Sequence, residues 1–407
     1  MRITRSLVAV LAAGALAFTA CGGTKSGSGN SGTSADTVKL GVLTDLSGPF
    51  LELSEAILAG NEIWVDQVNA AGGVCDRKIE LVVRDHGYDA DAGLVAYQEL
   101  EPQVLGFMHV LGSPINAALD QKYEENQTIA NALSWSSFIL KNPYIIVPGT
   151  TFDVEMINGL SFLMEQGKIK PGDTIGHIYL EGEYGENGLL GAEYFAKQHN
   201  VKIEKVKVLP TDADLRNAVT GFKGKGVKVI AMTTTPAQTL NVAVVNQQLG
   251  LDVPIVGNNP AFGPTILTKD TAKALANLYV VASATPYTSS VPKAQEVAKL
   301  FEARKDAGVP HSGVPYGYAL GEIWGQLLAS TCDDLTREGV KKAKDEADSL
   351  DIDNLVAKLD FSKPGSPATR EVYVAVPDLK TPGGLVQQGE LFTSDDAKSY
   401  RAPEEKG

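Results

Sequence analysis

The chain has 407 residues, of which 43% are apolar, and its formal net charge at pH 7 is −13. This length is enough for two lobes with separate hydrophobic cores, and the composition is typical of a globular protein. An acidic chain without a Lys/Arg cluster argues against nucleic acid as a partner. After the first twenty residues, no apolar run is long enough to cross a membrane.

The N-terminal segment differs in composition from the rest of the chain. Arg2 and Arg5 precede the apolar run 7–18, which is too short for a helix across a bilayer of about 30 Å and is typical of a secretory signal peptide. The run ends in the sequence FTAC, which resembles a bacterial lipobox, although Leu is usual where Phe stands. We therefore predict a lipoprotein signal peptide over 1–20 and lipidation of Cys21. An ordinary cysteine after a signal peptide is the alternative.

A tether follows the predicted cleavage site. Residues 21–36 contain GGTKSGSGNSGTS, which offers almost nothing to bury. Gly/Ser sequences of this kind behave as flexible coils. We expect this segment to hold a folded body off a membrane surface, at the outer face of the cell membrane.

From Thr37 onward, short apolar runs alternate with amphipathic helical patterns. The first series is predicted to contain strands at 38–46, 78–85, 104–110 and 128–133, with helices from a cap at Ser54 to Gly72-Gly73, from Asp89 or Asp91 to about 103, and over 114–126. A second series starts after Pro148-Gly149. It contains strands at 173–180, 201–209, 227–234, 254–257 and 278–284 and helices at 153–166, 185–199, 215–224, 236–249 and 261–276.

Helices at 293–307, 316–332 and 336–346 and a strand at 371–376 complete the predicted elements. Strands that alternate with helices form parallel sheets covered on both faces, so two such series predict an α/β fold of two doubly wound parallel-sheet lobes. Ligands of such sheets bind beyond the carboxyl ends of the strands. Candidate binding residues are therefore those that directly follow a strand.

Few residues suggest covalent or metal chemistry. With Cys21 lipidated, Cys75 and Cys332 remain, and the oxidising compartment of an exported protein allows a disulfide between them, two buried thiols being the alternative. The His and Cys residues show no metal-ligand spacing. The chain has no Gly-x-Ser-x-Gly, phosphate-binding loop or zinc motif, so we expect no enzyme, cofactor or metal site.

Five motifs occur along the chain in a characteristic order. They are GVLTDLSGPF (41–50), AAGGVCDRKIELVVRD (70–85), LGSP (111–114), GEYGENG (182–188) and DADLRNAVTGFKGKGVKVI (212–230). In order and spacing they resemble the type I periplasmic solute-binding proteins, most of all the branched-chain amino acid (leucine/isoleucine/valine) binding family of ABC importers. The resemblance covers about residues 38–380.

The resemblance implies three crossing segments between the lobes and a ligand cleft that closes by a hinge. We place the crossings near 149–153, 285–287 and 364–371. The predicted division is as follows: lobe one, 37–151 and 288–366; lobe two, 152–286 and 370–395; tail, 396–407. The element pattern alone does not reveal that the chain returns to lobe one.

In the family, serine or threonine groups that follow the third and fourth strands hold the ligand's carboxylate. The corresponding residues here are Ser113, which precedes a predicted helix, and Ser134, with Leu133 offering backbone groups. Small hydrogen-bond donors at a helix N-terminus suit an anion, because the helix dipole and free N–H groups favour negative charge. A plain helix cap is the alternative role for Ser113.

The second lobe offers Tyr184, which matches the family's tyrosine that closes over the ligand; a surface turn is its alternative. Thr235 and Asn259 fall where amino acid binders place an aromatic or acidic contact and the carboxylate for the α-ammonium group. Neither residue is acidic, and a buried ammonium without a carboxylate is costly. Either another acid reaches the site (Glu181, Glu183 or Asp45), or the ligand is not an α-amino acid.

Two aromatic residues flank the serine positions. His109 could pair with an anion, and Trp135 could stack on a ring, which would suit an aromatic or other carboxylate. Their alternatives are a core histidine at a strand end and a tryptophan on the lobe surface.

The resemblance also implies the function and its partners. The implied protein is an exported, lipid-anchored solute-binding component of an ABC importer. It captures a small amino-acid-like or other carboxylate ligand by hinge closure and delivers it to permease subunits in the membrane. Two alternatives stay open: a ligand-sensing subunit on the same fold, and a binder of aromatic acids or neutral amides.

Overall fold

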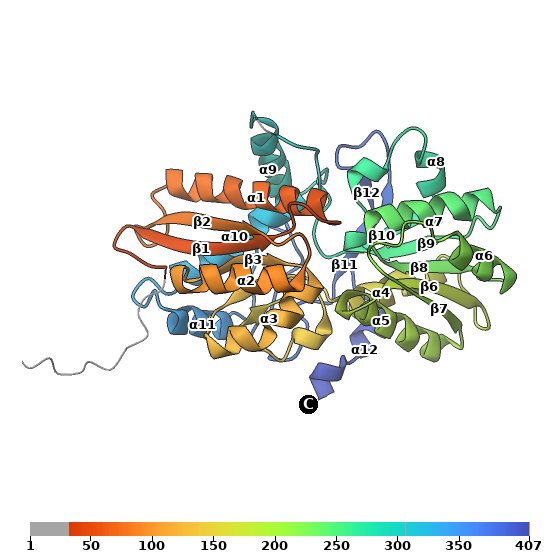
Figure 1. Ribbon diagram of the computed structural model, residues 1–407, viewed down its shortest axis with the longest axis horizontal. Helices are drawn as coiled ribbons and strands as arrows, with labels where there is room; N and C mark the ends of the chain where they lie inside the picture. Colours follow the sequence, from red (N-terminus) through yellow and green to blue (C-terminus); the bar gives the residue numbers. More distant parts are fainter. Residues whose placement is uncertain (1–31, 306, 407) are drawn as a thin grey trace, which may run out of the picture.

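A computed structural model describes residues 32–305 and 307–406 (Figure 1). The signal peptide, Cys21 and most of the tether lie outside the described residues. Residues 32–36, which we expected in the tether, pack on the folded body, because Lys39 N–H donates to the Gly32 carbonyl (2.8 Å) and Thr33 forms an antiparallel bridge with Val38. The folded body therefore begins at least five residues earlier than expected.

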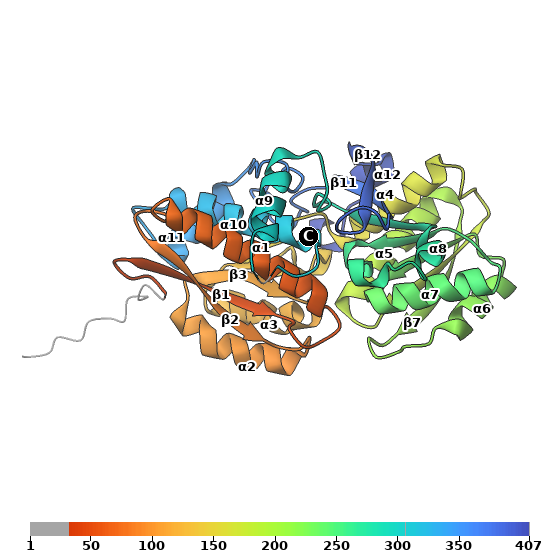
Figure 2. The same ribbon diagram turned by 90° about the horizontal axis from the view of Figure 1, so that it is seen from above.

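Lobe one is built on a five-stranded sheet with the order β2-β1-β3-β4-β5, in which every pair is parallel. Its strands are β1 (Thr37–Thr44), β2 (Lys78–Asp85), β3 (Gly106–Leu111), β4 (Ala130–Leu133) and β5 (Ile145–Ile146). Its helices are α1 (Leu51–Ala70), α2 (Ala90–Leu100), α3 (Ser113–Glu125), α9 (Pro292–Glu302), α10 (Gly313–Ala329) and α11 (Arg337–Glu346). The chain does return to this lobe, since α9 and α10 lie beside α1 (Figure 2) and α11 packs against α10.

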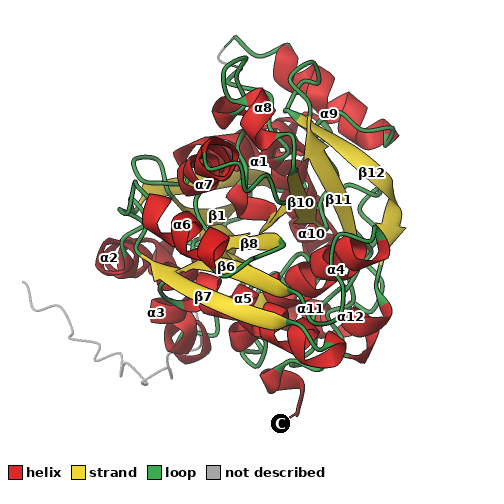
Figure 3. Ribbon diagram, turned by 90° about the vertical axis from the view of Figure 1, so that its right-hand side faces the viewer, coloured by secondary structure: helices red, strands yellow, loops and turns green. Residues whose placement is uncertain are grey.

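Lobe two is built on a seven-stranded sheet with the order β12-β11-β10-β9-β8-β6-β7. Its strands are β6 (Thr174–Leu180), β7 (Lys202–Val208), β8 (Val229–Thr233), β9 (Ile255–Asn258), β10 (Leu278–Ala282), β11 (Val372–Pro377) and β12 (Leu385–Phe392). Its helices are α4 (Phe152–Glu165), α5 (Glu183–His199), α6 (Arg216–Gly224), α7 (Pro236–Gln248), α8 (Ala272–Leu275) and α12 (Asp395–Ser399). Helices α6 and α7 cover one face of the sheet and α4 and α5 the other (Figure 3). The predicted pair of doubly wound lobes is confirmed, with β11 and β12 added as an antiparallel edge.

Three segments cross between the lobes, between β5 and α4, between β10 and α9, and between α11 and β11. They are hydrogen-bonded to one another. Thr150, in the first crossing, donates its backbone N–H to the Ser283 hydroxyl of the second (3.0 Å). It also donates its own hydroxyl to the Glu371 carbonyl of the third (2.7 Å). The crossings therefore form one connected hinge below the cleft.

The core of lobe one brings α1 and α10 into direct backbone contact. A Cβ atom on Gly317 would lie 2.0 Å from the Ile57 carbonyl oxygen, and one on Gly60 would lie 2.1 Å from that of Val314. Asn61 also donates its amide to the Gly317 carbonyl (2.7 Å). These glycines bring the N-terminal ends of both helices to the cleft as one unit.

Several predicted boundaries are wrong. Helix α1 begins at Leu51, and Ser54 does not cap it but accepts a hydrogen bond from Asp45 N–H (3.3 Å). The expected helix 261–276 is replaced by two 3-10 turns and the short α8, because Pro260 and Pro264 lack the N–H groups that a continuous helix needs. Strand β12 and helix α12 were not anticipated.

The C-terminal segment that we expected as a tail is packed against lobe two. Ala397, Tyr400 and Ala402 are buried beside Val154 and Ile157 of α4.

Cys75 and Cys332 are joined by a disulfide with a Cα–Cα distance of 5.3 Å, which links the loop after α1 to the end of α10. Within residues 32–305 and 307–406, no helix is long and apolar enough to span a membrane, and no cluster of three His, Cys, Asp or Glu side chains is arranged to hold a metal ion.

Candidate ligand-binding site

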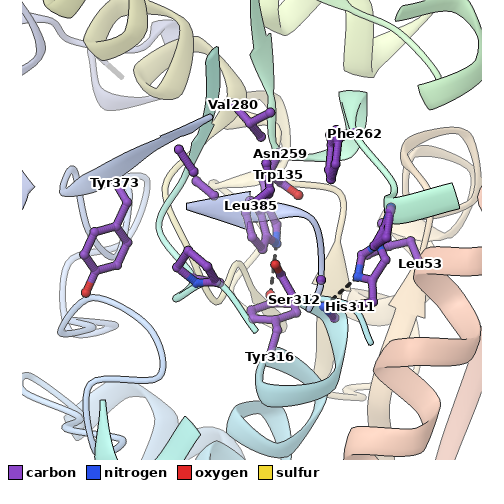
Figure 4. Close-up of a pocket in the computed structure, with 17 residues that line it drawn as sticks. Leu53, Trp135, Asn259, Phe262, Val280, His311, Ser312, Tyr316, Tyr373 and Leu385 are labelled. Carbon is purple, nitrogen blue, oxygen red and sulfur yellow. Dashed lines mark hydrogen bonds between the residues drawn. The ribbon is translucent and has the colours of Figure 1, made fainter. Parts of the chain in front are cut away.

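Two adjoining chambers lie in the cleft, one at the carboxyl ends of β3 and β4 and the other against β10, β11 and β12. The first is called the Ser113 chamber and the second, shown in Figure 4, the His311 chamber, after one residue that lines each; both are partly open to solvent. Both chambers are lined by Leu53, Trp135, Asn259 and Tyr316. These shared walls, drawn from both lobes, show that the chambers are neighbouring parts of one site.

Aromatic side chains form the wall of the Ser113 chamber. The rings of Trp135 and Phe152 stack with centroids 6.4 Å apart, and Phe152 packs against Tyr184 at 4.6 Å. Trp135 Nε1 donates to the Tyr316 hydroxyl (3.1 Å), which in turn donates to the Pro148 carbonyl (3.3 Å). The polar atoms of this row are thus occupied within the protein, and its ring surfaces are left for an apolar ligand.

The serine positions meet at one end of the same chamber. Gly112, with a φ of 106°, is the N-cap position of α3, so Ser113 is the first residue of that helix and not the cap that we gave as its alternative role. The Ser134 and Ser113 hydroxyl oxygens are 2.8 Å apart, and Ser134 Oγ lies 2.9 Å from Oε1 of Glu183. Ser113 and Leu133 line the chamber, while Ser134 is fully buried behind them.

Glu183 belongs to α5 and reaches across to lobe one. Burial raises the pKa of its carboxyl to about 7; hydrogen bonds with Ser134 and Ser136 oppose this shift, and the charge of Asp120 adds to it. The other two acids considered from the sequence lie elsewhere. Glu181 pairs with Lys207 (3.1 Å) on the surface, and Asp45 accepts hydrogen bonds from the turn that precedes α1.

Asn259 lines both chambers, with a buried acid directly behind it. Its amide donates to Glu155 Oε1 (3.0 Å), and Asn258 donates to Oε2 of the same carboxyl (2.9 Å). Burial raises the pKa of Glu155 to about 8, although these hydrogen bonds oppose the shift. Near neutral pH Glu155 is therefore protonated and supplies no charge to balance an ammonium group.

Two predicted contacts are placed away from the chambers. Thr235 is the N-cap of α7, where its side chain accepts from Gln238 N–H in a capping box. His109 is a core residue of β3 whose Nδ1 lies 2.7 Å from Asn61 Oδ1, and burial lowers its pKa to about 3. His109 therefore takes the core role that we gave as its alternative. Trp135, in contrast, does not take its alternative position on the lobe surface, because it lines the pocket.

Sequence reasoning missed Phe152, Tyr316 and Glu155. Phe152 and Glu155 lie at the start of α4, just after a crossing segment, and Tyr316 lies on a helix far along the chain. No local pattern marks these positions as binding residues. Only the position of the first crossing, which brings α4 to the cleft, could have drawn attention to Phe152.

The chambers carry no ionised side chain. Among the described residues that line them, none is Asp, Glu, Lys or Arg. His311 accepts the Gly313 N–H at Nδ1 (2.7 Å), and burial lowers its pKa to about 4, so it is neutral near pH 7. The walls of both chambers are therefore uncharged near neutral pH and largely aromatic or apolar.

Comparison with known proteins agrees with this architecture. A family model described as periplasmic binding protein matches residues 37–381. A solved fatty acid ABC transporter substrate-binding protein from Thermomonospora curvata is 35% identical, with a TM-score of 0.89 over 92% of this chain and 97% of that one. A branched chain amino acid ABC transporter protein from Thermus thermophilus with bound valine shares the fold, at 16% identity and a TM-score of 0.79 over 89% of this chain and 98% of that one.

One curated relative also matches. It is the leucine-, isoleucine-, valine-, threonine-, and alanine-binding protein of Pseudomonas aeruginosa, which is 22% identical over 229 residues. The match covers 55% of this chain and about 60% of the length of that relative. The resemblance noted in the sequence motifs is thereby confirmed at the level of the family.

Proposed function

Because this chain belongs to the periplasmic binding protein family, we propose that it is the extracytoplasmic solute-binding component of an ABC importer for an elongated monocarboxylate with an apolar body. A fatty acid is the first candidate. The family is one of solute-binding proteins, and the relative at 35% identity is named for fatty acid transport. The small amino acids named for the more distant relatives are the competing class.

The observation that carries this proposal is the uncharged, aromatic lining of two neighbouring chambers. An α-amino acid would bury an ammonium group, which needs a charged partner. Glu155, the acid behind Asn259, is held by three hydrogen bonds and protonated near neutral pH. An alkyl chain, in contrast, is stabilised by about 0.8 kcal/mol for each buried methylene group.

The same geometry supports one orientation of the ligand. Ser113, with Ser134 behind it and the Leu133 backbone beside it, receives the carboxylate at the N-terminus of α3, where the helix dipole favours negative charge. Trp135 and Tyr184 contact the apolar body. Asn259 stands at the junction of the chambers, past which the chain extends toward His311.

Binding is coupled to closure of the lobes about the hinge at Thr150. The closed form then delivers the ligand to permease subunits in the membrane.

Cys21 carries the lipid that anchors the protein to the outer face of the cell membrane, and the Gly/Ser tether lets the folded body extend away from that surface. Replacement of Cys21 by Ser should release the protein into the medium, and labelling with an alkyne fatty acid should mark the wild type alone.

Thermal unfolding of the mature protein tests the ligand assignment. A ligand that binds only the folded state stabilises it by about 2.7 kcal/mol at one hundred times its dissociation constant. We expect stabilisation to increase along the series hexanoate, octanoate and dodecanoate, because each added methylene group fills more of the two chambers. Stabilisation by leucine or valine, without any by the acids of this series, would contradict the proposal.

A further inference from the structure

A chain of hydrogen bonds crosses the cleft and ends at the ligand chamber. It starts at Glu183 of lobe two, passes through Ser134 (2.9 Å) and reaches Ser113 (2.8 Å), a residue that lines the Ser113 chamber. Ser134 is fully buried and Ser113 is nearly so, with 0% and 3% of their surfaces exposed. The two hydroxyls therefore connect an acid outside the chamber wall to the wall itself.

The direction of this chain depends on the proton of Glu183. A serine hydroxyl has one hydrogen to donate and two lone pairs to accept, so Ser134 cannot donate to both neighbours at once. When Glu183 is a carboxylate, Ser134 donates to it and Ser113 donates to Ser134. The Ser113 oxygen then offers only lone pairs to the chamber. When Glu183 is protonated, it donates to Ser134, Ser134 donates to Ser113, and the Ser113 hydrogen is free to point into the chamber.

A ligand carboxylate needs donors at its binding site, and it is repelled by a second carboxylate nearby. We infer that binding of the carboxylate ligand is coupled to uptake of one proton by Glu183, which reverses the two-serine relay and turns the Ser113 hydroxyl toward the ligand. The proton comes from solvent and stays on Glu183, and no covalent bond changes. This inference rests on the proposed function and adds to it the protonation state in which the site accepts an acid.

The surroundings of Glu183 favour the protonated form. Its pKa of about 7 arises mainly from burial, and Asp120 of α3 raises it further. Two cations of β7 pair with other acids, Lys207 with Glu181 and Lys205 with Glu193. A ligand carboxylate placed beside this group adds one more negative charge, which raises the pKa again and draws the proton in.

Other titratable groups near the relay do not replace Glu183 in this role. From α4, Asp153 is buried and bound by Ser137, Thr151 and Tyr400. From β6, His177 is bonded to Thr233, and burial lowers its pKa to about 3, so it stays neutral. The phenol of Tyr88, which faces the chamber from the turn after β2, has its pKa raised by burial and is neutral as well.

Calorimetric titration of the mature protein with dodecanoate, below its micelle concentration, tests the relay. A free carboxylic acid is ionised from about pH 6 to about pH 9, so any change of affinity there reports on the protein. Above the pKa of Glu183 we expect affinity to fall about tenfold for each pH unit. Titrations in two buffers with different ionisation enthalpies should show uptake that approaches one proton per ligand near pH 8.

Variants separate the relay from other effects of pH. Glu183→Gln keeps a permanent N–H donor toward Ser134, so its affinity should become independent of pH. Ser134→Ala breaks the relay in the middle and should weaken binding and flatten the pH dependence, because only the direct repulsion between the Glu183 and ligand carboxylates then remains. Glu186→Gln, an exposed acid on the same helix, is the matched control and should behave as wild type. Dodecanol, which has no charge, should bind wild type with no dependence on pH.

Each outcome decides between the claims. Dodecanoate that binds wild type equally at all pH values would overturn the relay and leave the proposed function standing. The relay is also overturned if Glu183→Gln and Ser134→Ala both fold, bind and keep the wild-type dependence on pH. If no fatty acid binds at any pH, the proposed function fails and the inference falls with it.

Discussion

The carboxylate of Glu52 on α1 accepts hydrogen bonds from both the backbone N–H (3.1 Å) and the hydroxyl (2.6 Å) of Thr265 in lobe two. This contact joins the lobes on the side of the cleft away from the hinge at Thr150. The same rim is lined by Phe262 and Gly263, and a Cβ atom on Gly263 would lie 2.5 Å from the Glu52 carboxylate. Glu52 therefore links the two lobes at the mouth of the cleft.

We predict that Glu52→Ala weakens ligand binding through faster dissociation. Hydrogen bonds to a charged group are worth about 1.5–3 kcal/mol when buried, but this pair lies at the surface, so about 0.5–1 kcal/mol, or two- to fivefold in affinity, is expected. Stopped-flow measurement of ligand release checks this. Glu55→Ala, a change at an exposed neighbour on the same helix, should leave the release rate as it is. Equal release rates in all three proteins would show that the contact does not hold the cleft closed.

Trp135 should report ligand binding by its fluorescence. The chain has three tryptophans, and Trp64 and Trp324 are buried in the core of lobe one, whereas Trp135 lines both chambers. Trp135→Phe should lose the ligand-induced change in emission and keep binding, and Trp64→Phe should keep the change. Trp135→Ala should weaken affinity by about 2 kcal/mol through lost apolar contact. A ligand response that survives in Trp135→Phe would place the ligand elsewhere.

Thr235 should matter for stability and not for binding. Removal of an N-cap side chain costs about 1 kcal/mol, so Thr235→Ala should lower the free energy of unfolding by this amount, while Thr235→Ser retains the cap. Denaturant unfolding and ligand titration of the same two variants check this. If Thr235→Ala lost more binding free energy than free energy of unfolding, Thr235 would instead be a ligand contact.

Glu155 should make the stability of the protein depend on pH. Its carboxyl has a pKa of about 8 in the folded protein against 4.5 as the ordinary value, so the folded state holds this proton more tightly than the unfolded chain. The corresponding stability is fully present below about pH 4.5, declines as the pH rises, and is lost above about pH 8. The Glu155→Gln variant should show a flatter decline in chemical unfolding across this range. Glu165→Gln, an exposed change on the same helix, should follow wild type.

The serine pair could be predicted from the sequence, and the acid that meets it could not. Ser113 and Ser134 follow neighbouring parallel strands, and the carboxyl ends of such strands share one edge, so their proximity is a consequence of local pattern and topology. Glu183 reaches them from the other lobe, and that contact depends on how far the cleft closes. We named it only as one of three acids.

Thr235 and Trp135 show a second limit of prediction. Both follow a strand, where a residue that caps the next helix and a residue that binds a ligand occupy the same sequence position. Thr235 precedes Pro236 and has Gln238 three residues on, a pattern that favours the cap. The orientation of Trp135 is set by Phe152 and Tyr316, which come from distant segments.

Strand β12 was not predicted because apolar and polar residues alternate only weakly in its half-exposed sequence LVQQGELF. The strand also contains a glycine with a φ of 77°.

Competition in native mass spectrometry tests the central claim most directly. The mature protein is first unfolded and refolded to remove any bound fatty acid. It is then mixed with equal concentrations of dodecanoate and leucine, and the mass of the bound ligand is measured. The uncharged aromatic chambers predict a complex with one dodecanoate and no leucine adduct. A complex that holds leucine in preference to dodecanoate would contradict the account, because it would require an ionised partner for the ammonium group that the chamber walls do not provide.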